Sequence, residues 1–335
     1  MILGKHAMDY CYSCFREVKK TLFGLCPFCG AHFHYQNSFD RLMGGSVLAG
    51  RFIAGHSRET RFVNSYLAFD WQTKKRVILW EFYPPLHAWR EIGLPPAIYC
   101  GGGFGSGGPE DDPAYWLEKY EELDALTARL GADGGSAWFP RWISSFQENN
   151  TMYTVTEYVE GETLEDFLNS RGGSVSWLEA LRLLAQPAEA LTRVHQLGAF
   201  HGALSPEKIL LAKDGTAKLL DTGLAACWNQ YVLSAFGRTG PEYWEPYHVF
   251  LASREGPAMD VYSLACCFYR AVSGIVPGHP GSYEDAADLP LPKERAGDVP
   301  CGMRELLLEV LSFSPEVCTS VPEFWHALNA SARQE

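Results

Sequence analysis

The chain has 335 residues, of which 47% are hydrophobic, so it is long enough to bury one large core or two. Its net charge of −12 and its pI near 5.3 argue against an extended surface for nucleic acid or anionic membranes, since both need clustered Lys and Arg. No apolar run reaches about 18 residues, and the first residues lack the basic-then-apolar order of a signal peptide. We therefore expect a cytoplasmic protein with no membrane partner.

Residues 1–46 form a cysteine-bearing module that is too short to build an apolar core of its own. Cys11 and Cys14 form one C-x-x-C pair, and Cys26 and Cys29 form a second pair eleven residues further on. Two such pairs suit tetrahedral zinc, because each turn points two thiolates at one ion about 2.3 Å away. A four-Cys site is closed, so the module is predicted to be a zinc ribbon in which zinc has a structural role and supplies most of the folding energy.

Two alternatives accompany this prediction. His32 and His34 could compete as zinc ligands, although four cysteines already complete the set. The module also carries five Lys or Arg against three Asp or Glu, and zinc ribbons can bind nucleic acid. We favour packing on the neighbouring domain or on a protein partner, because the excess of positive charge is small.

Residues 47–160 have the pattern of a small strand-rich lobe. Strands are predicted at 61–70 and 75–83, and two more within 141–159, the second ending just before Gly161. Between them a Gly-rich stretch, GGGFGSGGPEDDP, leads into a helix-period segment at 114–130. The literal G-x-G-x-x-G within that stretch, Gly103 to Gly108, lies after the third strand and before a helix, which is the wrong context for a phosphate clamp, so it is interpreted as a flexible connector.

Residues 161–335 are predicted to form a larger lobe that is nearly all helical, from the helix-period stretches ETLEDFLNS, SWLEALRLLAQPAEALTRVHQL, AMDVYSLACCFYRAVSG, GMRELLLEVLSF and VPEFWHALNASA. A small strand-rich half followed by a larger helical half is a two-lobed α+β layout. The predicted fold class is therefore α+β, with two lobes at 47–160 and 161–335 preceded by a small zinc ribbon.

Six separate motifs support a more specific interpretation. VILWEFYP (77–84) resembles the third-strand Val-Ala-Ile-Lys-Glu of protein kinases, and YTVTEYVEGETLEDFL (153–168) resembles their fifth strand, hinge and next helix. HGALSPEKIL (201–210) resembles the catalytic loop His-Arg-Asp-Leu-Lys-Pro-Glu-Asn-Ile-Leu, and LLDTG (219–223) resembles the metal-binding Asp-Phe-Gly. GPEYWEPY lies where Ala-Pro-Glu belongs, and DVYSLA resembles the buried helix whose Asp steadies the catalytic loop. In this order, they make residues 47–335 similar to a protein kinase domain, and the chain similar to bacterial Ser/Thr kinases with an N-terminal four-Cys zinc module.

The resemblance implies that the chemistry of phosphoryl transfer is incomplete. Trp80 stands where a kinase has the Lys that holds the α- and β-phosphates, and Ile78 stands where a small Ala lets adenine lie against the strand. Ala203 replaces the catalytic-loop Asp, and Lys208 replaces the Asn that binds the second Mg²⁺. The segment between the first two strands, HSRETRFVNS, carries no Gly to clamp phosphate. No catalytic residue is therefore assigned, and ATP with Mg²⁺ is not expected as a cofactor.

What remains of the family pattern is mostly structural. Asp221 could still bind a metal, but we favour the interpretation that it bonds local backbone. Asp260 is expected to accept backbone N–H groups from the catalytic loop, and Glu122 is interpreted as a surface charge because the Lys it would pair with is absent. The structural remnants are His201, Pro206, Asp221, Gly223 and Asp260, and the remnant nucleotide pocket is Ile78, Trp80, Thr156 and Asp221.

Three functions remain open from the sequence. The first is a pseudokinase, a catalytically inactive kinase homologue that acts as a regulatory or interaction scaffold for a protein partner. The second is an atypical ATP-binding kinase, or a nucleotidyl or phosphoryl transferase, with a site remodelled around Asp221 and Lys208. The third is a nucleotide sensor that binds nucleotide without turnover. An aromatic-rich stretch at 227–250 suits a partner surface or the packing of the larger lobe. The sequence also leaves open whether residues 85–113 cover the cleft.

Overall fold

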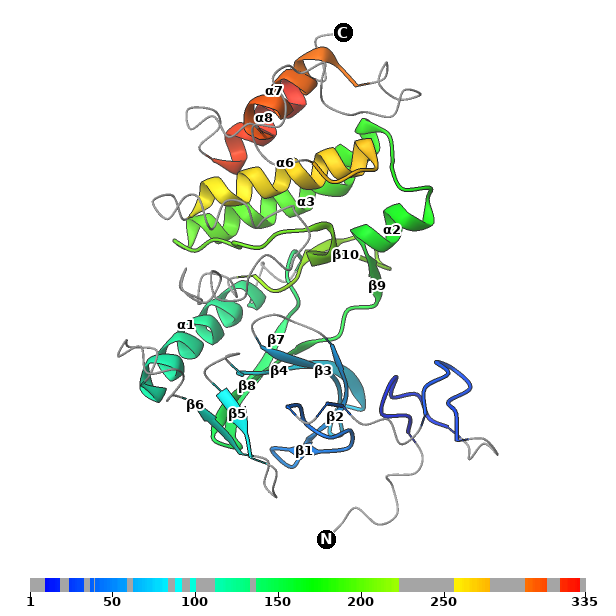
Figure 1. Cartoon of the computed structure of the whole chain (residues 1–335), viewed down its shortest axis with the longest axis vertical. Helices are drawn as coiled ribbons and strands as arrows, with labels where there is room; N and C mark the ends of the chain where they lie inside the picture. The colour runs from blue at the N-terminus through cyan, green and yellow to red at the C-terminus, as the bar shows by residue number, and fades with distance from the viewer. Residues whose placement is uncertain are drawn as a thin grey trace. The chain divides into compact units, whose positions relative to one another are not determined.

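The computed structural model places the chain in two compact units (Figure 1). The first comprises Met1–Ala128 and Arg141–Tyr158, and the second comprises Arg129–Pro140 and Val159–Glu335. The structure describes residues 10–18, 24–32, 37–38, 40–58, 63–83, 88–91, 97–100, 112–132, 137–222, 256–277, 299–311 and 320–331. The cysteine module lies within the first unit, so the boundary predicted at residue 46 stays a prediction.

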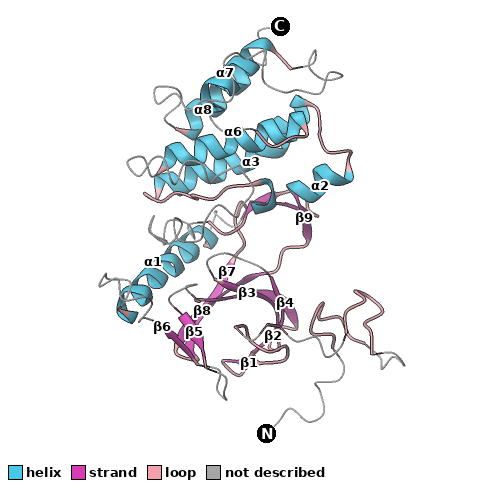
Figure 2. Ribbon diagram, viewed as in Figure 1, coloured by secondary structure: helices cyan, strands magenta, loops and turns pink. Residues whose placement is uncertain are grey.

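The first unit is built on one antiparallel sheet (Figure 2). Its strands follow the spatial order β1-β2-β3-β4-β8-β7, with a β-bulge in β2 between Ala54 and Ser57. The bounds are Val47–Leu48 for β1, Phe52–Arg58 for β2, Asn64–Asp70 for β3, Lys75–Glu81 for β4, Trp142–Glu148 for β7 and Thr151–Glu157 for β8. The predicted runs at 61–70, 75–83 and 141–159 therefore correspond to β3, β4, β7 and β8.

The two faces of this sheet bury different sets of side chains, because successive residues of a strand point to opposite faces. On one face, Val77 and Leu79 of β4 join a core that includes Tyr66, Ala68, Tyr153 and Val155. On the other face, Ile78 and Trp80 of β4 join Leu67 and Phe69 of β3. The two positions of β4 that differ from the kinase pattern, Ile78 and Trp80, therefore share the second face.

A hairpin and a helix complete the first unit. The hairpin pairs β5 (Ala88–Arg90) with β6 (Ile98–Cys100), and Ile98 N–H donates to the carbonyl of Asn149 at 2.8 Å. Sequence patterns did not predict this hairpin. Helix α1 (Pro113–Gly131) corresponds to the helix predicted at 114–130, and Tyr120 forms a 2.6 Å hydroxyl contact with Thr154 of β8.

The second unit combines helices with a small sheet. Its described helices are α2 (Leu164–Ser170), α3 (Trp177–Gln196), the 3₁₀ turn η2 (Pro206–Lys208), α6 (Pro257–Ser273), α7 (Cys301–Leu311) and α8 (Val321–Ser331). Thr163 and Ser176 cap α2 and α3 by accepting from N–H groups three residues on, as capping residues do. A three-stranded sheet, ordered β11-β10-β9, was not expected in a lobe predicted to be nearly all helical: β9 is Gly161–Thr163, β10 Ile209–Ala212 and β11 Ala217–Leu219.

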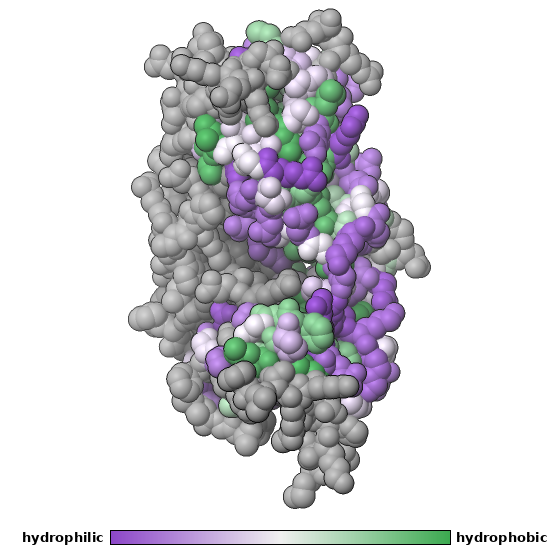
Figure 3. All heavy atoms as spheres, turned by 90° about the vertical axis from the view of Figure 1, so that its right-hand side faces the viewer, coloured by the Kyte–Doolittle hydropathy of each residue, from purple (hydrophilic) through white to green (hydrophobic). Residues whose placement is uncertain are grey.

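Helix α6 is the buried centre of the second unit and packs on α3, α7 and α8. Its one strongly basic side chain, Arg270, is 5% exposed and contacts Glu165 at 2.6 Å and the carbonyl of Gly173 at 2.5 Å. Among the described residues, no helix is both long enough and apolar enough to cross a membrane. Most of the described surface in Figure 3 is hydrophilic, with smaller hydrophobic areas between.

Candidate functional site

The four cysteines of the module lie close together, with all four Sγ atoms within 4.8 Å of one another. Cys11 Sγ is 3.8 Å from Cys29 Sγ, and Cys14 Sγ is 3.7 Å from Cys26 Sγ. A tetrahedron with metal–sulfur bonds of about 2.3 Å has edges of about 3.8 Å, so these spacings suit one zinc ion. The cluster found among the described residues contains these cysteines and not His32, and His34 lies outside the described residues.

Two similar turns present the thiols. Phe15 N–H donates to the carbonyl of Cys11 at 2.7 Å, and Gly30 N–H donates to the carbonyl of Cys26 at 2.8 Å. Both Phe15 and Gly30 adopt positive φ, of 52° and 73°. Burial raises the pKa values of Cys11 and Cys14, whereas at Cys26 the effect of burial is outweighed by backbone N–H groups of Phe28 and Cys29 and by hydrogen bonds from the neighbouring thiols, so that its pKa falls to about 7. A thiolate held by backbone donors is the form that binds zinc.

On β4, the kinase-pattern positions carry bulky side chains that are fixed in place. Trp80 donates its indole N–H to the hydroxyl of Thr156 on β8 at 3.0 Å. Ile78 and Thr156 are both buried. Three of the four residues predicted as a remnant pocket therefore lie together in the first unit, while Asp221 belongs to the second unit.

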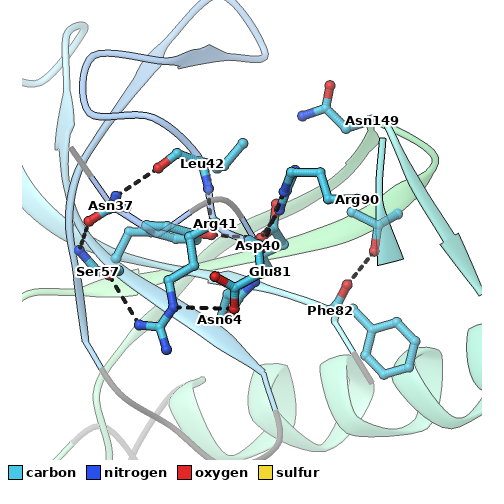
Figure 4. A network of polar contacts seen from close by, with 12 residues as sticks. Asn37, Asp40, Arg41, Leu42, Ser57, Asn64, Glu81, Phe82, Arg90 and Asn149 are labelled. Atoms are coloured by element: carbon cyan, nitrogen blue, oxygen red, sulfur yellow. Dashed lines mark hydrogen bonds and ion pairs between the residues drawn. The ribbon is translucent and has the colours of Figure 1, made fainter. Parts of the chain in front are cut away.

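The next residue, Glu81, points to the opposite face and is fully buried. Its carboxylate accepts from Tyr66 and Tyr153 hydroxyls, both at 2.7 Å, and from the Asn64 amide at 2.9 Å. Arg90 of the hairpin supplies the counter-charge at 2.5 Å and is only 4% exposed (Figure 4). The resemblance places Glu81 at the Glu that follows the third-strand Lys but indicates no partner for it, because Arg90 comes from a hairpin that no local sequence pattern predicts.

In the second unit, Asp260 of α6 holds the segment that resembles a catalytic loop. Its carboxylate accepts from the backbone N–H groups of His201 at 2.7 Å and Gly202 at 2.8 Å, and it contacts His195 Nε2 at 2.8 Å. Gly202 has φ of 75°, a conformation that a side chain disfavours. Pro206 opens the 3₁₀ turn that follows. These contacts fix the backbone of the loop without using a side chain of Ala203.

Lys208 and Asp221 form an ion pair within the same unit. The ammonium of Lys208 contacts the carboxylate of Asp221, and the backbone carbonyl of Lys208 accepts from Leu220 N–H at 2.9 Å. Asp221 has φ of 59°, and its side chain is 11% exposed. The two positions that the resemblance assigns to metal binding are therefore occupied by an acid and its own counter-ion.

Other predicted features are placed as follows. Glu122 of α1 is exposed and pairs with Lys119 at 3.0 Å, which agrees with its interpretation as a surface charge. Gly223, the Gly-rich stretch at 103–108 and the aromatic-rich stretch at 227–250 all lie outside the described residues. Of residues 85–113, the structure describes 88–91, 97–100 and 112–113, which belong to the first unit.

The pKa of His201 is lowered from 6.5, first by burial and then by the positive charge of Lys208, against the opposing effects of Asp260 and Asp221. Its ring is satisfied as a neutral imidazole, because Nδ1 accepts from Ala203 N–H at 3.3 Å and Nε2 lies 2.9 Å from the Leu220 carbonyl. Protonation would place a proton on Nδ1 and break the first bond.

We therefore predict that His201 stays neutral below pH 6.5. A lowered folded-state pKa contributes stability that is complete above the unfolded value and is lost as pH falls through the folded value. A difference of one between the folded and unfolded pKa corresponds to about 1.4 kcal/mol. An NMR titration of the imidazole nitrogens should show the Nε2–H tautomer and a midpoint below 6.5, and a midpoint at or above 6.5 would contradict the assignment.

Part of the chain is similar in sequence to known protein kinases. Residues 140–289 match a family model described as "Protein kinase domain". Serine/threonine-protein kinase PknA of Mycobacterium tuberculosis is 32% identical over 169 residues, which are 50% of this chain and 38% of PknA. Serine/threonine-protein kinase cds1 of Schizosaccharomyces pombe is 30% identical over 138 residues, which are 39% of this chain and 30% of cds1. The matches thus span about a third of the length of these relatives.

Two solved structures share the fold at low sequence identity. The structure titled "PpkA-294 apo form" has a TM-score of 0.64 and 21% identity, with 86% of this chain and 99% of that chain covered. The PknI kinase domain of Mycobacterium tuberculosis, in a crystal structure of a point mutant, has a TM-score of 0.59 and 18% identity, with 87% of this chain and 99% of that chain covered.

Proposed function

The chain has a kinase-like fold and bacterial Ser/Thr kinase homologues, and from this premise we propose that it is a pseudokinase, a regulatory or interaction scaffold that does not transfer phosphate. The proposal concerns chemistry rather than shape, because one fold hosts many functions and the activity resides in the site. It rests on the residues that replace those needed for phosphoryl transfer.

The ion pair between Lys208 and Asp221 is the observation that carries the proposal. In protein kinases, the Asp of Asp-Phe-Gly and the catalytic-loop Asn hold the two Mg²⁺ ions. Here the carboxylate is already neutralised, and an ammonium stands where the second metal ligand would be. Two like unit charges 4 Å apart cost about 4 kcal/mol at an effective dielectric constant of 20, and a divalent ion doubles that cost. A metal at Asp221 must therefore displace the Lys208 side chain.

Two further positions support the same conclusion. Ala203 has only a methyl group, which cannot take a proton from a substrate hydroxyl, and general base catalysis contributes typically about 10²–10⁴ in rate. Trp80 cannot bridge phosphates as an ammonium does, and its indole N–H is already engaged by Thr156. Phosphoryl transfer consists almost entirely of positioning and charge stabilisation, so these replacements remove most of what the protein contributes.

The proposal includes one structural zinc ion, which would be held by Cys11, Cys14, Cys26 and Cys29. The sulfur spacings of 3.7 and 3.8 Å suit a four-coordinate ion, and two of the thiols, Cys11 and Cys26, are buried. A closed four-sulfur shell leaves no position for water or substrate, so the ion would hold the module together rather than catalyse. The partner implied by a scaffold is another protein.

The direct test is a phosphate-transfer assay with γ-labelled ATP and either Mg²⁺ or Mn²⁺, on the intact chain and on Asp221→Asn. We expect both proteins to give the same background of incorporated label, since Asp221 holds no metal. The comparison separates the protein's own activity from that of a contaminating kinase. Transfer that the wild type shows and Asp221→Asn lacks would refute the proposal and would favour an enzyme with a remodelled site.

A further inference from the structure

The cysteine module lies on the sheet face that carries Ile78 and Trp80. Phe15 stacks on Phe69 of β3, with ring centroids 5.7 Å apart and planes inclined by 18°, and Tyr10 lies 5.2 Å from the same ring. Phe15 is 5% exposed and belongs to the same apolar cluster as Ile78. By the resemblance, this is the face against which adenine and the phosphate Lys would lie. Aromatic side chains of the module pack against part of this face, around Leu67, Phe69 and Ile78.

The backbone of β2 is shaped to receive the module. At its bulge, His56 N–H does not pair within the sheet register but donates to the carbonyl of Tyr12 at 3.0 Å. Asn37, which comes after the two cysteine turns within the same module, accepts from Ser57 N–H at 3.0 Å and donates to the carbonyl of Gly55, also at 3.0 Å. The polar groups that the bulge leaves unpaired are thus satisfied by the N-terminal segment.

Gly55 makes this close approach possible. A Cβ atom at this position would lie 2.1 Å from the Tyr12 carbonyl oxygen and 2.6 Å from the Phe15 ring. Its backbone is not in the left-handed region, so the residue is required by space and not by conformation. The module can therefore approach β2 this closely only because position 55 has no side chain.

The metal cluster in turn sets the position of Phe15. Phe15 directly follows Cys14, takes a left-handed φ of 52°, and is held there by its N–H bond to the Cys11 carbonyl. The apolar cluster between the two cysteine turns consists of Cys11, Val18 and Cys26, with Cys14 packed against them, which is too little to hold the turns without a metal. Whatever holds the four thiols together therefore holds the phenyl ring against the sheet.

We propose that the segment Tyr10–Phe15 of the module and this sheet face form an intramolecular interface. The segment stays bound to the sheet only while the four cysteines hold a metal ion. Loss of the metal releases Phe15 and uncovers the face with Leu67, Phe69 and Ile78. The inference goes beyond the proposed function, since the interface would exist whether or not the chain transfers phosphate.

The first test removes the metal from the intact chain with a chelator and follows hydrogen exchange at the His56 amide. Exchange of this amide should accelerate by about a hundredfold or more. This factor is near the lower end of the stability loss expected when a buried phenyl ring loses its contacts. Adding one equivalent of Zn²⁺ should restore the protection. Unchanged protection in metal-free protein would overturn the proposed dependence on the metal.

The second test separates the interface from the metal site with three variants. Gly55→Ala and Phe15→Ala should keep one zinc ion per chain, because no cysteine is altered, yet should expose the His56 amide in the presence of zinc. Phe28→Ala is the matched control, since Phe28 lies in the second turn of the same module and is 54% exposed. It should change neither metal content nor exchange. If Gly55→Ala and Phe15→Ala exchange as the wild type does, the interface is wrong, and this outcome is independent of any measurement of phosphate transfer.

Discussion

Replacing Cys14 with Ser is expected to reduce the zinc content of the purified protein from about one ion per chain to nearly none. Cys14 Sγ lies 3.7 Å from Cys26 Sγ, and a hydroxyl at that position is a poor zinc ligand. Zinc binding in such modules is worth about 10–16 kcal/mol at neutral pH and is largely the folding energy of the module. The loss should therefore unfold residues 10–32 locally and leave the helices of the second unit intact.

Elemental analysis of the metal, together with the far-UV helical signal, would check this result. Cys301→Ser is the control, because Cys301 is exposed on α7 and belongs to the other unit. It should retain both the zinc and the helical signal. A Cys14→Ser protein that still carried stoichiometric zinc would show that the four cysteines are not the ligand set.

The second large effect is expected at the buried ion pair of the first unit. Arg90→Met should destabilise that unit by about 3–5 kcal/mol, because it leaves the carboxylate of Glu81 buried without a counter-charge. Glu81 is fully buried and keeps three neutral donors, which compensate only in part. The loss should appear as faster hydrogen exchange throughout β3 and β4.

Two comparisons make this prediction specific. Glu81→Gln combined with Arg90→Met removes both charges but keeps an acceptor for the tyrosines, and it should recover much of the lost stability. Arg141→Met removes an exposed pair with Glu157, whose nearest atoms are 3.8 Å apart, and should cost at most about 1 kcal/mol. An Arg90→Met protein as stable as Arg141→Met would mean that Arg90 contributes no buried charge.

Much of the fold follows from local sequence patterns. The apolar and aromatic runs of β3, β4, β7 and β8, and the helical period of α1 and α3, indicate the α+β layout, which the structure and its likeness to kinase structures confirm. The spacing of the two C-x-x-C pairs predicts the cluster of four thiols, since each pair is presented by one short turn. Such features are encoded within a few neighbouring residues.

Other parts depend on contacts between distant residues and have no local pattern. The ion pair of Lys208 with Asp221 joins positions thirteen residues apart through a long side chain, and the sequence left open whether that Lys would face a phosphate. The hairpin of β5 and β6 is stabilised by Arg90 reaching Glu81 and by Ile98 pairing with Asn149, not by strand propensity alone. Neither contact can be deduced before the sheet is folded.

The contact between the cysteine module and β2 is the clearest example of a feature that no local sequence pattern predicts. Gly55 is one of 32 glycines in the chain, and nothing in its sequence neighbourhood distinguishes it as the place where the module meets the sheet. Phe15 is likewise one of 19 phenylalanines. Their importance comes from the bulge in β2 and from the turn at Cys11, which together place a carbonyl and a ring against the same Cα atom.

Thermal unfolding with and without millimolar ATP and Mg²⁺ tests most directly whether this kinase-like protein can bind the metal–nucleotide complex that phosphate transfer requires. A ligand present at 100 times its Kd stabilises a protein by about 2.7 kcal/mol, which moves the unfolding midpoint by several degrees. We predict no shift with ATP and Mg²⁺ together beyond the shift that each gives alone. A shift that requires both would contradict the account, because it would mean that a metal–nucleotide complex displaces the Lys208 side chain from Asp221 and occupies the site.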